Sequence, residues 1–173
     1  MLAAKRQEML RQLLSKLGTT IYAQIWENRL KLTDIQSRKS FDEKPLVAIK
    51  KIGKSKPIVV AVGNAASLTV GNDIEVINPF SHPRVLFSDF TVGEKLFQYA
   101  LKELLGKNLL SPTPVIIVHP MEKTEGGLTM IEVRALRELA FGAGARDSIV
   151  YVGKVLSPHE IDFDSIKEKI GEQ

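Results

Sequence analysis

The sequence contains no cysteine, which excludes thiol catalysis and thiolate metal sites and fits a reducing compartment. Aromatic residues make up only 6% of the chain, so leucine, isoleucine, valine and alanine must build most of the core. Apolar runs are short: Ile58 to Val62 falls far below the roughly 20 residues that a membrane span needs. Charges interrupt the first ten residues, MLAAKRQEML, where a signal peptide would be apolar. These absences predict a cytoplasmic protein.

The 173 residues have the composition of one globular domain that needs neither disulfides nor a structural metal. Hydrophobic residues make up 44% and charged residues 25%, which is ordinary for a folded chain. The net charge of +4 and the isoelectric point near 9.3 are compatible with an anionic membrane, an acidic protein or a nucleic acid as partner. The charge balance alone does not choose among these three partners.

Residues 2–17 have the pattern of an amphipathic helix, which Gly18 would end. The leucines of its apolar side are Leu10, Leu13, Leu14 and Leu17, and the basic residues that flank them are Lys5, Arg6 and Arg11. Such a helix packs on its own domain, pairs with a second copy of the chain, or lies on an anionic membrane. We therefore predict a partner-binding or membrane-binding helix over residues 1–18, followed by a single domain over residues 19–173.

The rest of the chain has the element order of an α/β fold, with two hairpins first and alternating strands and helices afterwards. The predicted strands are 21–26, 30–35, 45–50, 58–62, 114–119 and 148–152, and the predicted helices are 92–105 and 131–140. We expect a last helix to begin at Ser157, because Ser157 and Glu160 have capping-box spacing and Pro158 would lie in the first turn. This order predicts a mixed sheet flanked by helices.

Three patterns that suggest chemistry have simpler interpretations. Ala48 to Ser55 satisfies a relaxed phosphate-loop pattern, but a strand follows it instead of a helix, which favours a lysine-rich hairpin turn. Gly142 to Arg146 is glycine-rich but follows a helix, which indicates helix termination. The three histidines, His82, His119 and His159, have neither metal-ligand spacing nor a local nucleophile motif. No metal site is therefore predicted.

Three stretches of the chain follow the pattern of one protein family. They are Lys44 to Ile49 with Val60 to Asn64, then Val85 to Phe90, and above all the run EVRALRELAFGAGAR over residues 132–146. That run is similar, nearly position for position, to the E-R-R-A-x-R-E-x-A-x-G-A-G-A-R of MreB, the bacterial actin-like family of rod shape. The order of segments from about residue 21 to 152 resembles the first half of that family. The resemblance implies subdomain I of an actin-like, ribonuclease-H-like ATPase.

The first phosphate-binding hairpin is where the chain departs from this family. The family motif is D-L-G-x-x-N-T, and the resemblance puts Gln24 at the metal-side aspartate, Trp26 at the glycine and Asn28 within the turn. An indole would obstruct the close approach to phosphate that glycine permits. The second hairpin and the adenosine site belong to the half of the family fold that this sequence does not contain. We therefore expect a degenerate site with no ATP or magnesium cofactor.

Two family active-site positions are kept: Asp89, in the D-F pair, and Glu132, at the glutamate that positions the attacking water. Neither should act without a held phosphate, because phosphoryl transfer depends mostly on positioning and charge stabilisation. The leading expectation is a non-catalytic MreB-like module that binds a protein partner or itself, linked to bacterial cell shape. Two alternatives stay open: half of an ATPase completed by a partner chain, and a peripheral membrane module anchored by residues 2–17. Gln24 on the first strand disfavours nucleic-acid chemistry of the ribonuclease-H kind.

Overall fold

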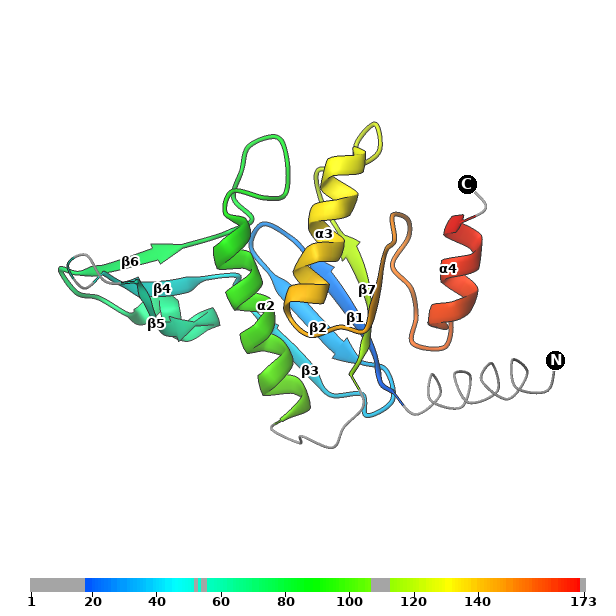
Figure 1. The fold of residues 1–173 in the computed structure, drawn as a ribbon, viewed down its shortest axis with the longest axis horizontal. Helices are drawn as coiled ribbons and strands as arrows, with labels where there is room; N and C mark the ends of the chain where they lie inside the picture. Colours follow the sequence, from blue (N-terminus) through cyan, green and yellow to red (C-terminus); the bar gives the residue numbers. More distant parts are fainter. Residues whose placement is uncertain (1–17, 52, 54–55, 107–112, 172–173) are drawn as a thin grey trace.

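A computed structural model describes residues 18–51, 53, 56–106 and 113–171. Over this part of the chain the strands form two sheets, and helices lie on both faces of the larger one (Figure 1). The predicted α/β fold, with a mixed sheet flanked by helices, is confirmed. The helix predicted over residues 2–17, with its leucines and basic residues, lies outside the described residues.

The larger sheet has five strands in the order β3-β2-β1-β7-β8. Their bounds are β1 (Thr20–Ile25), β2 (Leu30–Asp34), β3 (Ser40–Glu43), β7 (Val115–Pro120) and β8 (Asp147–Val150). The first three form an antiparallel meander, whereas β7 pairs in parallel with both β1 and β8. Since parallel strands point the same way, the carboxyl ends of β1, β7 and β8 meet at one edge of the sheet. That edge carries the candidate site.

The larger sheet separates the hydrophobic core into two clusters, and helices cover each of them. On one face lie α2 (Phe90–Leu105) and α3 (Met130–Gly142), and on the other lies α4 (Phe163–Gly171). Side chains alternate along β1, so Ile21 and Ala23 join the larger cluster under α2 and α3, while Tyr22 joins the smaller cluster under α4. This two-sided burial explains why β1 and β7 read as nearly continuous apolar runs.

A second, three-stranded sheet projects from the larger one beside α2 (Figure 1). It contains β4 (Val47–Lys50), β5 (Ile58–Val62) and β6 (Ile74–Ile77) in the order β5-β4-β6, with the 3-10 helix η1 (Gly63–Leu68) after β5. We call residues 47–77 the finger. Val47, Ile49 and Val62 belong to the larger core cluster, so the finger is anchored to the domain by one face of its sheet.

Several local predictions were incomplete or wrong. The sequence did not reveal β3, β6 or η1, because β3 and β6 leave most of their side chains partly or fully exposed and so lack the continuous apolar run that marked β4 and β8. The last helix begins at Phe163 instead of Ser157. The Ser157 amide does donate to the Glu160 carboxylate at 2.7 Å, but this hydrogen bond closes only a turn. Asp162 is the residue that caps the helix, accepting from the Ser165 amide at 2.8 Å.

Candidate functional site

The positions singled out by the family resemblance lie at the edge where β1 and β7 end. Trp26 and Asn28 belong to the turn between β1 and β2, Asp89 immediately precedes α2, and Glu132 lies in the first turn of α3. Both helices begin at this edge (Figure 1). The fold therefore brings these four positions to one side of the domain.

The β1–β2 turn is held rigidly by its own side chains. The Trp26 amide donates to the Arg29 carbonyl at 2.9 Å, and the Arg29 guanidinium lies 5.2 Å from the centre of the Trp26 ring, within range of a cation–π contact. Arg29 also donates two hydrogen bonds to Asp42, at 2.7 and 2.5 Å, and so holds the pKa of that carboxyl below its usual value. Trp26 is half-buried and Asn28 is exposed. The indole is thus held against the turn by the Arg29 guanidinium.

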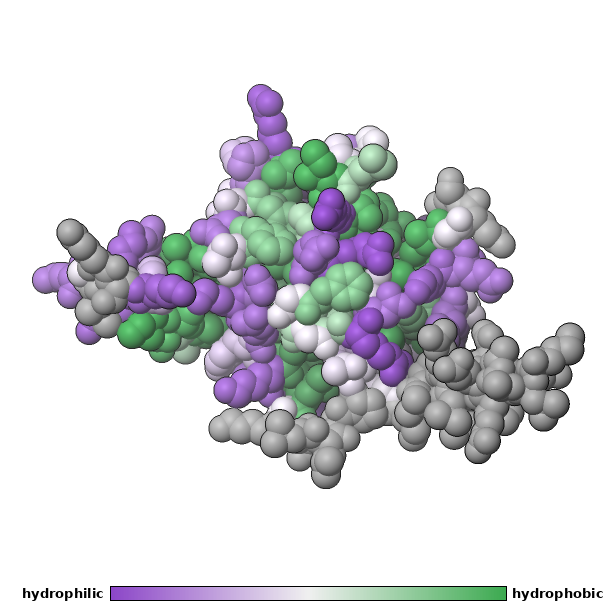
Figure 2. All heavy atoms as spheres, in the orientation of Figure 1, coloured by the Kyte–Doolittle hydropathy of each residue, from purple (hydrophilic) through white to green (hydrophobic). Residues whose placement is uncertain are grey.

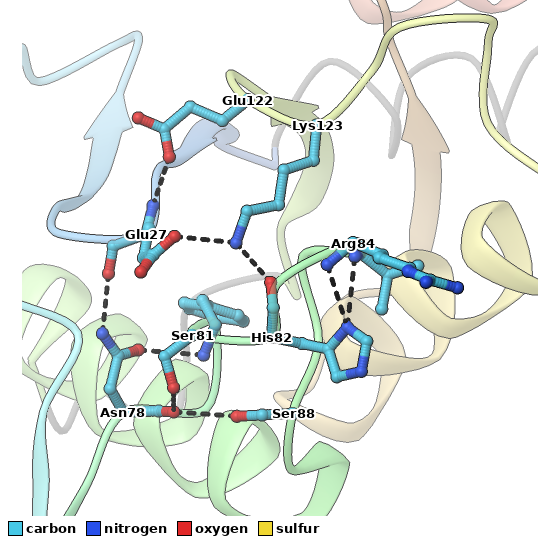
Figure 3. A network of polar contacts seen from close by, with 10 residues as sticks. Glu27, Asn78, Ser81, His82, Arg84, Ser88, Glu122 and Lys123 are labelled. Atoms are coloured by element: carbon cyan, nitrogen blue, oxygen red, sulfur yellow. Dashed lines mark hydrogen bonds and ion pairs between the residues drawn. The ribbon is translucent and has the colours of Figure 1, made fainter.

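Two charged residues after β7 bind the same turn (Figure 3). The Glu122 carboxylate accepts a hydrogen bond from the Glu27 amide at 2.8 Å. The ammonium of Lys123 lies 2.7 Å from the Glu27 carboxylate. A backbone amide that could face an anion therefore already faces a carboxylate of the same chain, and a second carboxylate lies beside it. These two carboxylates disfavour the binding of a phosphate at the turn, because like charges at such distances repel.

The loop between β6 and α2 is tied to this network (Figure 3). Asn78 donates from its side-chain amide to the Glu27 carbonyl at 2.7 Å, and its side-chain oxygen accepts from the Phe80 amide at 2.9 Å. Lys123 donates a further hydrogen bond to the His82 carbonyl at 2.5 Å. The turn, the end of β7 and the loop before α2 therefore form one connected polar network.

Both retained family carboxylates cap helices. Asp89 accepts from the Val92 amide at 3.0 Å and is the N-cap of α2. Glu132 closes a capping box at the start of α3: its carboxylate accepts from the Thr129 amide at 2.8 Å, while the Thr129 hydroxyl oxygen accepts from the Glu132 amide at 3.2 Å. The T-x-x-E spacing of residues 129–132 could have revealed this role from the sequence.

Gln24 is buried on the face of the sheet that α4 covers. It pairs in register with His119, and its side-chain amide lies 3.8 Å from the sulfur of Met121. A neutral amide in this position brings no charge to a metal ion. Over the residues that the structure describes, no group of three or more His, Cys, Asp or Glu side chains could hold a metal.

His119 forms a buried network that the sequence did not predict. Its Nε2 lies 3.1 Å from the Gly153 carbonyl, which can only accept, so Nε2 carries the proton and Nδ1 accepts from the Tyr22 hydroxyl at 2.5 Å. Tyr22 in turn accepts from the Leu156 amide at 3.3 Å, and the Tyr151 ring packs edge-on against the imidazole. Burial lowers the pKa of His119. The network fixes the segment that leads from β8 toward α4.

An apolar surface lies at the start of α3, next to the site. Met130 and Ile131 are 88% and 81% exposed. A groove of about 510 Å³ runs along the same helix, lined by Leu128, Met130, Val133, Arg134, Arg137, Glu138 and Phe141. Figure 2 shows hydrophobic residues gathered over this end of α3.

Among the helices of the described ranges, none is long and apolar enough to cross a bilayer.

The arrangement of the sheet and its helices defines an actin-like domain. The structure is similar to that of MreB5 of Spiroplasma citri bound to ADP, with a TM-score of 0.58 and 18% sequence identity. The similarity covers 78% of this chain and 38% of that one. MreB5 bound to AMPPNP matches with a TM-score of 0.55 over the same shares. At this identity the likeness establishes the fold.

Sequence similarity identifies the family to which this actin-like domain belongs. The sequence model of the MreB/Mbl protein family matches residues 39–156, and the chain belongs to this family. It is 37% identical over 111 residues to the cell shape-determining protein MreB of Haemophilus influenzae and 34% identical to that of Escherichia coli K12. Each match covers 61% of this chain, and the chain spans only 30% of either relative. The range that the family model matches, residues 39–156, includes Asp89 and Glu132 but begins after the β1–β2 turn.

Proposed function

We propose that this chain is a non-catalytic member of the MreB/Mbl family, which works by self-association within the system that determines bacterial cell shape. The link to cell shape rests on family membership and on the names of the related proteins. The absence of catalysis rests on one observation above all, the hydrogen bond from the Glu27 amide to the Glu122 carboxylate in the β1–β2 turn.

The β1–β2 turn opposes nucleotide binding for three physical reasons. A phosphate needs free N–H donors and a backbone that it can approach closely. Here the Glu27 amide already has an acceptor, and the Trp26 side chain stands where the family resemblance expects glycine. The Glu27 and Glu122 carboxylates also add negative charge, of which Lys123 neutralises only part.

The two retained carboxylates support the same proposal. Asp89 and Glu132 each accept backbone amides at a helix start, which is sufficient reason for both residues to be present. The alternative, an ATPase half completed by another chain, needs Glu132 to leave its capping box and orient water. It predicts that Glu132→Gln abolishes ATP turnover in the completed assembly.

Self-association is supported by the apolar surface at the start of α3. Exposed apolar side chains that gather beside a groove are typical of protein contacts. Arginines beside this groove, Arg134 and Arg137, also suit an interface, where arginine is enriched. A peripheral membrane role through residues 2–17 remains a separate hypothesis, and those residues lie outside the described part of the chain.

The experiment measures assembly and turnover on the same purified full-length chain. Sedimentation velocity should show concentration-dependent association that the double variant Met130→Ser/Ile131→Ser weakens about tenfold or more, because serine buries less apolar surface at the interface. Phosphate release from Mg-ATP should stay at the level of buffer with and without assembly. A matched control, Leu68→Ser/Val70→Ser, removes two equally exposed apolar residues from the finger and should associate as the unmodified chain does. Turnover that rises with assembly would overturn the non-catalytic proposal.

A further inference from the structure

The face of the larger sheet that α4 covers is less completely packed than the opposite face. Among the described residues, α4 is the one helix on this face, whereas α2 and α3 share the other. Only Phe163 and Ile166 of α4 are buried, and Ile35 and Ile161 of the same cluster stay partly exposed. Figure 1 shows α4 at the margin of the domain, next to the segment that follows β8. Part of this sheet face therefore lacks a covering helix.

A groove of about 630 Å³ opens beside α4 at the carboxyl end of β8. Its apolar walls come from three parts of the chain: Leu128 and Val133 near the start of α3, Val152 after β8, and Ile166 and Ile170 on α4. The carboxylate-bearing side chain of Glu160 also lines it. The groove thus combines apolar walls with an acidic group, which suits an amphipathic basic segment.

The first 17 residues of the chain join the domain close to β8. A Cβ added at Gly18 would lie 2.7 Å from the guanidinium of Arg146, and Arg146 directly precedes β8. From Arg146 to Val150 the strand rises about 13 Å. A helix over residues 2–17 would rise about 12 Å between Leu10 and Gly18. Such a helix, running back along β8 from Gly18, would therefore bring Leu10 to the level of the groove.

The charge pattern of this segment also matches the surroundings of the groove. Arg6 precedes Leu10 by four residues, so in a helix it lies one turn farther on the leucine side. This position directs its guanidinium toward Glu160. Residues 1–17 carry four basic side chains and one acidic, whereas residues 157–171 carry four acidic and two basic. Opposite charges on the two segments favour their contact.

The tether favours the chain's own helix over that of a second copy. Because Gly18 alone separates the segment from residue 19 of the domain, its effective concentration at the groove is about millimolar. A second copy would have to reach that concentration in solution to compete for the same groove.

We propose that the groove between β8 and α4 binds the chain's own N-terminal segment, residues 2–17, as an amphipathic helix. Leu10 and Leu13 enter the groove, and Arg6 pairs with Glu160. The docked helix completes the packing of this sheet face and withdraws its leucines from other partners. This contact is independent of nucleotide binding and of self-association through α3.

Cross-linking tests the contact directly, because the chain has no cysteine of its own. The full-length variant Leu10→Cys/Val152→Cys is treated with a short bismaleimide, and cross-linked monomer is measured by mass spectrometry. It should form about tenfold faster than in Gln12→Cys/Val152→Cys, because docking holds position 10 at the groove and turns position 12 toward water. Equal rates would overturn the proposal. Cross-linked dimers in place of monomers would overturn it too, because a second copy would then fill the groove.

Thermal melting of the full-length chain gives an independent reading of the helix side. Leu10→Asp/Leu13→Asp should lower the melting temperature by about 6 °C or more, because apolar contacts in the groove are lost. Gln12→Asp/Ser15→Asp adds the same charge on the polar side of the helix and should melt as the unmodified chain does. Equal melting temperatures for these two variants would contradict docking.

The groove side has its own matched pair of exposed valines. Val152 lines the groove and is 46% exposed, whereas Val155 lies outside it and is 60% exposed. Val152→Asp should lower the melting temperature by about 3 °C, and Val155→Asp should leave it unchanged. Equal effects of the two substitutions would overturn the proposal. So would a chain that sediments with phosphatidylglycerol vesicles while its engineered thiols stay unlinked, since the leucines would then face lipid.

Discussion

Substitution of Glu132 separates a capping role from a catalytic one. Its carboxylate accepts from both the amide and the hydroxyl of Thr129, at 2.8 and 2.7 Å. Glutamine keeps an oxygen that can accept these hydrogen bonds, as capping boxes with glutamine do, whereas alanine removes it. A catalytic carboxylate would tolerate neither change. The two variants therefore give different patterns under the two roles.

The expected loss of unfolding free energy follows from the two interactions that the Glu132 carboxylate makes at the start of α3. Loss of an N-terminal cap costs about 1 kcal/mol of unfolding free energy. Loss of a negative charge near the first turn of α3 adds about 0.5 kcal/mol through the helix dipole. Glu132→Ala should thus lower the unfolding free energy by about 1.5 kcal/mol and Glu132→Gln by about 0.5 kcal/mol. For a domain of this size the alanine variant should melt about 3–6 °C lower.

Urea denaturation followed by circular dichroism measures both values, with thermal melting as a second reading. Glu138→Ala is the matched control, because Glu138 is exposed in the middle of the same helix. Equal destabilisation by alanine and glutamine at Glu132, or an alanine variant as stable as the Glu138 control, would refute the capping account. Thr129→Ala should reproduce the destabilisation seen with Glu132→Ala, because both residues belong to one capping box.

Three further predictions concern the core and the turns. Since burial lowers the pKa of His119 below its ordinary value of about 6.5, the unfolded chain binds more protons, and stability should fall as the pH drops below that value. His119→Gln should remove this dependence in denaturant titrations from pH 8 to 5, whereas His159→Gln should keep it. Ser148→Ala should leave the unfolding free energy unchanged or raise it by about 1 kcal/mol, because the Ser148 hydroxyl is buried without a described partner. A clear decrease of the unfolding free energy would contradict this prediction. Gly63→Ala should lower the unfolding free energy more than Gly106→Ala does in the same assay. Both glycines have positive φ, but an added Cβ would meet the Glu43 carboxylate only at Gly63. Equal losses of unfolding free energy would contradict that close approach.

Long periodic segments were predictable from the sequence. The helical spacing that runs from Val92 to Leu105 and from Ile131 to Ala140 was sufficient to locate α2 and α3 within two residues. The continuous apolar runs likewise located the central strands β7 and β8. Family resemblance supplied the actin-like fold, which the structural match confirms.

The details of the site were harder to predict because they depend on residues far apart in the chain. The Glu27 amide and the Glu122 carboxylate are 95 residues apart, and no local pattern connects them. The position of Glu122 and Lys123 two and three residues after the end of β7 was the available signal, since functional side chains often follow the carboxyl ends of parallel strands. The start of α4 was misjudged for the opposite reason: a local capping pattern at Ser157 exists, but no helix continues from it.

The central claim is that the β1–β2 turn holds no nucleotide, and calorimetric titration of the full-length chain with Mg-ATP tests it most directly. The account predicts no saturable heat and no shift of the melting temperature at any nucleotide concentration, because the Glu122 carboxylate and the Trp26 side chain oppose phosphate at the turn. Saturable binding that Glu122→Gln strengthens would contradict the claim, since it would mean that phosphate reaches the turn in competition with the carboxylate.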